Sequence, residues 1–312
     1  MSYGGAKAGP TANSMGRVAL IGGNGQLGSD IVRMWPGSAA GQRGDELVAL
    51  THAEFEVTDF DQVRSVLTGV GPSLVINTAA FHRVDDCEKQ ATTAFQVNAL
   101  GVKYMAEVCR ELGATLMHFS TDYVFDGDSE EPYGEEDPTS PISAYGISKE
   151  AGEHFLRYTI PDDHILVRSS GLYGVAGASG KGGNFVETMI RLAREERPIR
   201  VVDDQCSCPT YTPDLAGVLF ELIERGARGT YHITNSDKCT WFQFAGEVFK
   251  LLGLSPDFGP TTSAEFGAPA LRPAYSVLAN KRIEALGVAQ PRPWQDALRA
   301  YLEARGHQTA RT

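Results

Sequence analysis

Long apolar runs are missing from this chain of 312 residues. Its uninterrupted hydrophobic stretches have the length of single β-strands, whereas a membrane-spanning helix needs about 20 apolar residues. Basic residues are also scarce, because 28 Lys and Arg stand against 39 Asp and Glu and give a formal net charge of −11. Nucleic acids and acidic membrane surfaces select basic proteins. We therefore expect neither a nucleic acid nor a membrane as a partner.

Cysteine is sparse as well, with five scattered residues. An odd number without regular spacing argues against a disulfide framework. Cys206 and Cys208 stand close together, but no second pair or histidine cluster completes a zinc site. We expect free thiols, a cytoplasmic protein and no bound metal. Residues 1–15 are small and polar without an apolar signal core, and we interpret them as a disordered tail.

One segment concentrates the negative charge. The run from Asp126 to Asp137 carries seven carboxylates in twelve residues, a density that a metal site could use. Pro132, Gly134 and Pro138 interrupt it, however, and are typical of turns. We favour a solvated loop over a metal site here.

Short apolar runs alternate with longer helical patterns, which predicts strand–helix–strand units and a parallel sheet. We expect strands at 18–21, 47–50, 74–77, 115–120 and 165–168, and helices at 26–35, 60–67, 91–112 and 145–158. The fold class is therefore α/β, a Rossmann-type doubly wound parallel sheet with a smaller C-terminal substrate-binding lobe. The NAD(P)-binding domain is expected over 16–170, with strands returning near 199–205 and 230–234. Residues 171–312 should form mainly the lobe.

A glycine turn directly follows the first expected strand. Its glycines fit Gly22-x-x-Gly25-x-x-Gly28, or the same pattern begun at Gly23. Missing side chains let the backbone approach a pyrophosphate, whose charge lies at the positive end of the helix that starts near Gln26. A glycine triplet alone is a weak signal, but a preceding strand and a following helix are the context it requires. We predict dinucleotide binding by Gly22, Gly25, Gln26, Leu27 and Gly28.

The tip of the second expected strand carries no acid. Leu47–Leu50 is followed by Thr51, His52 and Ala53, where a carboxylate would bind an adenosine ribose and repel a 2′-phosphate. Its absence favours NADPH as the cofactor and leaves NADH as the alternative.

Tyr145 and Lys149 are four residues apart, so on a helix they share one face. A free phenol has a pKa of about 10, and a nearby ammonium lowers it. Tyrosine can then protonate a carbonyl oxygen as a hydride reaches the carbon. The spacing alone is weak evidence, because Tyr3 and Lys7 repeat it in the N-terminal tail, and an exposed helix with an ordinary Tyr and Lys is the alternative. Position favours Tyr145, which comes soon after Thr121 at the end of a buried strand.

Together these features resemble the extended short-chain dehydrogenase/reductase family, and within it the dTDP-4-dehydrorhamnose reductases. The resemblance covers roughly residues 17–287, and its most specific segments are Ser-Thr-Asp-Tyr-Val-Phe-Asp-Gly at 120–127 and Gly-Asn-Phe-Val at 183–186. It implies NAD(P)H-dependent reduction of the C4 ketone of a nucleotide-linked 4-keto-6-deoxy sugar, foremost dTDP-4-dehydro-L-rhamnose to dTDP-L-rhamnose. A homodimer is left open.

The resemblance also implies roles for individual residues. Tyr145 would donate the proton, Lys149 would lower its pKa and hold the nicotinamide ribose, and Thr121 would orient the carbonyl. Asn98 would steady Lys149 through water or serve as a buried polar group. The implied adenosine-side residues are Glu56, Val57, Ala79, Ala80 and Phe81. The implied substrate residues are Thr121, Asp122, Asn184 and Arg272, with Lys181 as a second cation near the diphosphate.

Two departures from the relatives bear on specificity. Relatives commonly carry Asp at the position of Glu56, and Trp within 170–173, where this chain has Ser-Gly-Leu-Tyr. Gly171 removes a stacking surface, which leaves the sugar open. Another nucleotide-sugar ketoreductase, epimerase or dehydratase of this fold is an alternative, although a single carboxylate, Asp122, beside the threonine counts against a dehydratase. A non-catalytic relative similar to the regulatory subunit of methionine adenosyltransferase is disfavoured by the intact Thr121, Tyr145 and Lys149.

Overall fold

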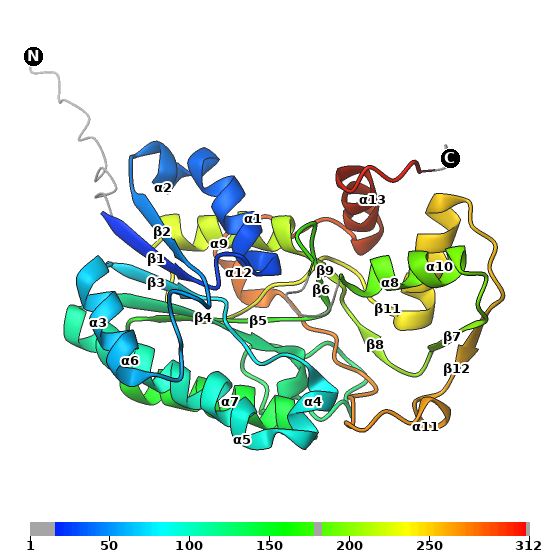
Figure 1. Ribbon diagram of the computed structural model, residues 1–312, viewed down its shortest axis with the longest axis horizontal. Coiled ribbons are helices and arrows are strands. Elements are labelled where there is room, and N and C mark those ends of the chain that lie inside the picture. The colour runs from blue at the N-terminus through cyan, green and yellow to red at the C-terminus, as the bar shows by residue number, and fades with distance from the viewer. Residues whose placement is uncertain (1–15, 178–182, 310–312) are drawn as a thin grey trace, which may run out of the picture.

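The computed structural model describes residues 16–177 and 183–309, so the N-terminal tail (1–15) and Lys181 lie outside the described residues. A six-stranded sheet in the order β10-β5-β4-β3-β1-β2 forms its centre, and every neighbouring pair is parallel (Figure 1). The strands are β1 (Arg17–Ile21), β2 (Glu46–Leu50), β3 (Leu74–Asn77), β4 (Thr115–Thr121), β5 (His164–Ser169) and β10 (Gly229–His232). The chain reverses its direction of winding between β1 and β3, where open α/β sheets place ligands.

Helices cover both faces of the sheet (Figure 1). Val18 and Leu20 point into one apolar core and Ala19 and Ile21 into the other, because successive strand residues face opposite sides. On the first face lie α1 (Gln26–Met34), α2 (Ala39–Gln42), α9 (Thr212–Glu224) and α12 (Lys281–Ala285). On the second lie α3 (Phe60–Val70), α6 (Gly101–Leu112) and α7 (Ala144–Thr159), with α4 (Val84–Lys89) and α5 (Ala91–Phe95) at one end. The predicted doubly wound fold is confirmed.

The smaller lobe has its own apolar core, built around Tyr173, Phe244 and Tyr301. Its helices are α8 (Phe185–Arg194), α10 (Trp241–Leu252), α11 (Ser263–Phe266) and α13 (Trp294–Ala304). Its strands are β6 (Leu172–Tyr173), β7 (Ile199–Val202), β8 (Cys206–Ser207), β9 (Thr210–Tyr211), β11 (Cys239–Thr240) and β12 (Phe258–Thr261). Since α9, β10 and α12 pack with the central sheet, residues 171–312 contribute to both parts.

One of the two returning strands lies elsewhere than predicted. The strand near 230–234 does return, as β10 beside β5. The strand near 199–205 forms as β7 but pairs with β12 in the lobe, not with the central sheet. The reason is packing: Ile199 and Val201 bury their side chains in the core of the lobe.

The expected helix over 91–112 is interrupted. Between α5 and α6, residues Gln96–Leu100 form a π-helical turn, a deviation that often marks functional sites. Within it, Asn98 is completely buried. Gly101 follows at a point where a Cβ would lie 3.0 Å from the carbonyl oxygen of Val57. This close approach ties the segment after β2 to the helix layer.

The acidic run is only partly a solvated loop. Asp126 accepts a hydrogen bond from the Tyr133 hydroxyl at 2.6 Å. Glu135 is buried and accepts from the backbone N–H groups of His232 (3.3 Å) and Arg282 (3.0 Å). The prediction of a fully solvated segment was therefore wrong for Glu135, because the C-terminal part of the chain folds over it. Within the described residues, no helix has the length and apolarity that crossing a bilayer requires.

Candidate active site

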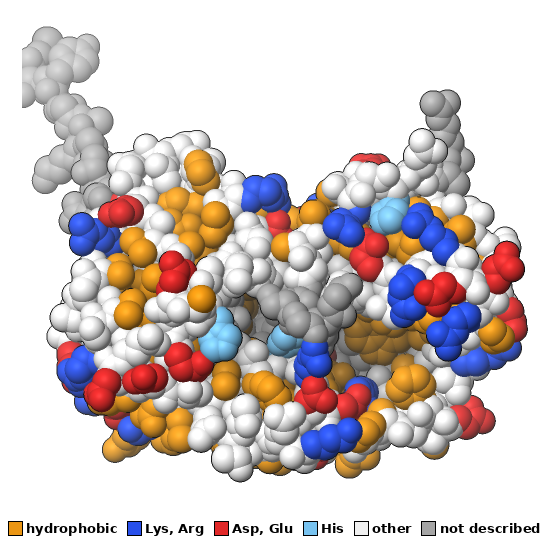
Figure 2. All heavy atoms as spheres, in the orientation of Figure 1, with side chains coloured by type: hydrophobic (Ala, Val, Ile, Leu, Met, Phe, Trp, Pro, Cys, Tyr) orange, Lys and Arg blue, Asp and Glu red, His pale blue; other side chains and the backbone are white. Residues whose placement is uncertain are grey.

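A cleft of about 1270 Å³ lies between the carboxyl ends of the central strands and the smaller lobe. Figure 2 shows a hollow between these two parts of the molecule. Single-ligand pockets typically measure about 300–1,000 Å³, so this cleft has room for two ligands side by side. The predicted site residues that line it are Gly22, Gly25, Gln26, Leu27, Glu56, Val57, Ala79, Ala80, Phe81, Thr121, Asp122, Tyr145, Lys149, Asn184 and Arg272. Gly28 is not among the residues that line the cleft.

The glycine turn requires its glycines. Gly22 has a φ of +81°, and the N–H groups of Gly22 and Gly23 donate to the carbonyl of Leu50 at 2.9 and 3.0 Å. A Cβ on Gly28 would lie 2.1 Å from the carbonyl oxygen of Gly22. Gly25 precedes α1 without a side-chain cap, so N–H groups of the first helical turn remain for an anion. Nearby, the buried Oε1 of Gln26 has no hydrogen-bond partner among the described residues.

A histidine, His52, lines the cleft at the tip of β2. The Glu54 carboxylate is bound to the N–H and hydroxyl of Thr51, at 2.9 and 2.7 Å, and does not line the cleft. Glu56 does line it, but its Oε1 accepts from the N–H and hydroxyl of Thr58 at 2.9 and 2.8 Å. Its Oε2 lies 3.4 Å from Nδ1 of His52. The tip of β2 therefore carries an imidazole in place of an acid that would repel a 2′-phosphate, and the Glu56 carboxylate in the same end of the cleft is held by Thr58 and His52.

Thr121 and Tyr145 meet at the end of β4. Thr121 caps the short 3₁₀ turn Asp122–Val124 by accepting from the N–H of Tyr123 at 3.2 Å. Tyr145 lies in the first turn of α7 and packs edge-on against the Tyr123 ring at a centroid distance of 5.8 Å. Burial raises the pKa of Tyr145, while its hydrogen bond with Thr121 lowers that pKa by less. The phenol is therefore held in its protonated form.

Lys149 shares the cleft-facing side of α7 with Tyr145, as predicted, but its hydrogen bonds go elsewhere. Its ammonium donates to the carbonyl oxygen of Phe119 and lies 3.4 Å from Nε2 of His118. Burial lowers the pKa of Lys149 to about 8, against a smaller raising effect of Glu153. That Lys149 lowers the pKa of Tyr145 stays a prediction; burial is the largest effect on the pKa of each of the two residues.

Asp122 organises the floor of the cleft. It is buried, and its carboxylate accepts from the hydroxyls of Thr121 (3.0 Å), Ser170 (2.7 Å) and Ser276 (2.6 Å). Burial raises the pKa of Asp122, and the three hydroxyls counter that rise. Ser276 comes from the C-terminal segment, and no sequence pattern marked it. The carboxylate therefore joins β4, β5 and the lobe.

Two of the four described substrate candidates, Asn184 and Arg272, already bind other groups of the protein. Asn184 caps α8 and donates to the Gly174 carbonyl (3.1 Å) and to the Tyr301 hydroxyl (2.9 Å), so its amide mainly holds the lobe together. Nη2 of Arg272 lies 3.0 Å from both carboxylate oxygens of Asp85, and Nη1 donates to the Ala270 carbonyl at 3.0 Å. Arg272 still lines the cleft.

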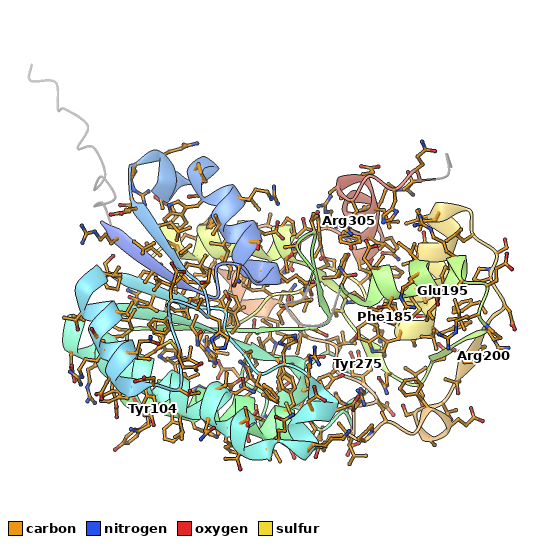
Figure 3. All side chains as sticks on the ribbon, viewed as in Figure 1. Tyr104, Phe185, Glu195, Arg200, Tyr275 and Arg305 are labelled. Carbon is orange, nitrogen blue, oxygen red and sulfur yellow. The ribbon has the colours of Figure 1, made fainter. Side chains whose placement is uncertain are left out.

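An aromatic wall borders the lobe side of the cleft. The rings of Trp241 and Phe185 lie 4.7 Å apart, and Figure 3 shows Phe185 at the end of α8 nearest the central sheet. Gly171 has a φ of +52°, and a Cβ there would lie 3.6 Å from Cη2 of Trp241. Trp241 on α10 therefore places an indole ring beside Gly171, in a segment that has no Trp of its own. Sequence reasoning missed Trp241, because only the fold brings it to Gly171.

Asn98 does not contact Lys149 directly. Its Oδ1 accepts from the N–H of Phe81 at 2.9 Å, and its Nδ2 donates to the Phe81 carbonyl and to the Ser148 hydroxyl, each at 3.0 Å. It is a buried polar group that fixes the segment after β3 to α7, and its link to Lys149 through water stays a prediction. Among the described residues, no group of three or more His, Cys, Asp or Glu side chains is placed to hold a metal ion.

A doubly wound sheet with a glycine turn at its reversal point, and a Thr–Tyr–Lys set beyond β4, defines a short-chain dehydrogenase/reductase. Comparison with known proteins narrows the class: the chain belongs to the family described as the RmlD substrate binding domain, whose model matches residues 16–306.

Individual relatives cover nearly the whole chain. The spore coat polysaccharide biosynthesis protein SpsK of Bacillus subtilis is 40% identical, over 93% of this chain and 98% of its own. A dTDP-4-dehydrorhamnose reductase of Streptomyces griseus is also 40% identical, over 90% and 91%. The crystal structure of dTDP-4-dehydrorhamnose reductase from Bacillus anthracis in complex with NADP superposes with a TM-score of 0.86 at 35% identity, covering 93% and 99%.

Proposed function

We propose that this protein reduces the C4 ketone of a nucleotide-linked 4-keto-6-deoxy sugar with a hydride from NADPH. The observation that carries the proposal is the position of Thr121 and Tyr145 beyond β4, where both line the cleft that begins at the glycine turn. The names of the reductase relatives support dTDP-4-dehydro-L-rhamnose as the substrate and dTDP-L-rhamnose as the product.

The cleft residues fit a dinucleotide. At the glycine turn, a Cβ on Gly28 would lie 2.1 Å from the Gly22 carbonyl oxygen and a Cβ on Gly22 would lie 2.7 Å from the Thr78 hydroxyl oxygen, so only glycines allow this turn. The first turn of α1 has no side-chain cap and is open to a pyrophosphate. The free Oε1 of Gln26 offers an acceptor in the same place. His52 at the tip of β2 supports NADPH over NADH.

Side chains of the protein supply the proton that the ketone oxygen takes up during reduction. When bound, the cofactor supplies the hydride. The Tyr145 phenol, kept protonated by burial, gives its proton to the oxygen of the ketone as that oxygen becomes negative. Thr121 hydrogen-bonds the same oxygen and fixes its position. Lys149, one helical turn from Tyr145, is the cation that stabilises the phenolate left behind.

The lobe supplies recognition of the sugar nucleotide. Trp241 and Phe185 offer a flat apolar surface for a ring, and Arg272 offers a cation for a diphosphate. The cysteines, five in number and without regular spacing, support a cytoplasmic location. A homodimer remains a prediction.

The test is a coupled assay in which 4-keto-6-deoxy nucleotide sugars are generated in situ and the loss of reduced cofactor is followed by absorbance. We expect turnover with NADPH that exceeds turnover with NADH. Tyr145→Phe should lower kcat at least about a hundredfold, the usual scale for a lost general acid. Tyr158→Phe is the matched control, since Tyr158 lies on the same helix with 88% of its surface exposed, and it should keep full activity. Undiminished turnover in Tyr145→Phe would contradict the proposal.

A further inference from the structure

A directed chain of hydrogen bonds reaches Lys149 from behind the cleft. Asn77 ends β3, and His118 lies opposite it on β4. Oδ1 of Asn77 lies 3.1 Å from the backbone nitrogen of Ala79, and Nδ2 lies 3.1 Å from Nδ1 of His118. Because a backbone N–H can only donate, the amide oxygen must face Ala79 and the amide nitrogen must face the imidazole. Nδ1 of His118 therefore accepts a hydrogen bond.

The ring of His118 then has only one place for its proton. The residue is completely buried, and both burial and the charge of Lys149 hold its pKa well below the usual range, so the imidazole is neutral. With Nδ1 accepting, the ring proton sits on Nε2, and this nitrogen lies 3.4 Å from Nζ of Lys149. A neutral amine can accept that N–H, whereas an ammonium has no lone pair to offer. The contact favours the deprotonated lysine.

We propose that Asn77 and His118 are positioning residues that present a ring N–H to Lys149, ease the loss of its proton, and thereby couple dinucleotide binding to proton uptake by this lysine. The inference deepens the proposed function, because it rests on Lys149 meeting a bound dinucleotide as a cation.

The other groups around Lys149 do not remove the preference for the deprotonated amine that the His118 N–H creates. Glu153, one turn further along α7, favours the ammonium, but its carboxylate is bound by Arg168 at 2.7 and 2.9 Å and by Arg157 at 2.7 Å. The Phe119 carbonyl accepts equally well from an amine or an ammonium. Burial sets the pKa of Lys149 at about 8. If binding requires the ammonium, affinity for NADPH is full below this pH and falls as pH rises through it.

The ring tautomer is directly observable by long-range ¹H–¹⁵N spectra of the protein labelled at its histidines, without cofactor or sugar. We expect a pyridine-type Nδ1 and a pyrrole-type Nε2 for His118, assigned by loss of these signals in His118→Gln. The opposite tautomer, or a doubly protonated ring, would overturn the inference. This measurement needs no variant that might fail to fold other than the one used for assignment.

Asn77→Asp reverses the chain of hydrogen bonds while keeping the shape of the side chain. The new carboxylate accepts from both Ala79 N–H and His118 Nδ1–H, so Nε2 becomes an acceptor for the Lys149 ammonium. NADPH affinity should fall by about tenfold per pH unit above pH 8 in the unchanged protein. In Asn77→Asp that fall should begin at least about one pH unit higher.

Asn24→Asp is the matched control, because it adds a carboxylate to the same cleft from an exposed position outside the chain of hydrogen bonds. We expect it to weaken NADPH binding without moving the pH at which affinity falls. Titration calorimetry in buffers of different ionisation enthalpy should record proton uptake on NADPH binding near pH 9. An equal shift in both variants, no shift in Asn77→Asp, or no proton uptake would each contradict the inference. None of these readouts uses the sugar, so a failed reductase assay and a failed proton linkage are separate results.

Discussion

Replacing Lys149 by methionine should stabilise the fold at neutral pH while it removes activity. The lysine is buried to 2% exposure, and its pKa is lowered from 10.5 in the exposed chain to about 8. A lysine whose pKa is depressed on folding destabilises the folded state wherever it is protonated. The destabilisation is complete below pH 8 and disappears as pH rises above 10.5. Methionine fills a similar volume and carries no charge to desolvate.

The size of the effect follows from the pKa. A difference of 2.5 units between 10.5 and about 8 corresponds to about 3 kcal/mol at pH 7. Methionine leaves the Phe119 carbonyl without the lysine donor, a loss that does not depend on pH. The stability difference between Lys149→Met and the unchanged protein should therefore shift by about 2 to 3 kcal/mol between pH 7 and pH 10, in favour of the variant at pH 7.

Urea unfolding, followed by far-ultraviolet circular dichroism at several pH values, measures this difference. His164→Asn serves as a control for a buried titratable group distant from the cleft lining. A stability difference that stays constant from pH 7 to pH 10 would refute the claim that folding depresses the pKa of Lys149.

Three further changes test other parts of the site. Gly28→Ala places a Cβ 2.1 Å from the Gly22 carbonyl oxygen, so NADPH affinity measured by fluorescence should fall at least about tenfold, and unchanged affinity would contradict the fit of the turn. Arg168→Met leaves the buried Glu153 without its bidentate partner. The free energy of unfolding in urea should fall by about 3 kcal/mol, the low end of the range for a broken buried ion pair, because Arg157 still binds Glu153. His52→Asp puts a carboxylate at the tip of β2 and should move the ratio of NADPH to NADH affinity at least about tenfold towards NADH; an unmoved ratio would count against the 2′-phosphate position.

Much of the fold was predictable because local and global signals agree. Val18–Ile21 is apolar at every position, as a strand buried on both faces must be, and the glycines after it gain their meaning from that strand and the helix that follows. The place of β7 was not predictable, since a four-residue strand of the sequence Ile-Arg-Val-Val does not show which sheet will accept it. The π-helical turn at Gln96–Leu100 also leaves no mark in a helical pattern.

The site was predictable where its residues lie on consecutive elements. Thr121, Tyr145 and Lys149 follow from motif and spacing, and all three line one cleft. Contacts made across the fold were not predictable. Trp241 reaches Gly171 from α10, and Ser276 reaches Asp122 from the C-terminal segment. The contact between His118 and Lys149 was missed for the same reason.

The destination of the hydride tests the central claim most directly. The reaction can be run with NADPH carrying deuterium at the transferred position, and the product sugar examined by proton and deuterium NMR. If the cleft reduces a C4 ketone, deuterium should appear at C4 of the 6-deoxy sugar in a single configuration, and Tyr145→Phe should slow its incorporation. Deuterium at another carbon, or cofactor oxidation that leaves the sugar unlabelled, would contradict the account.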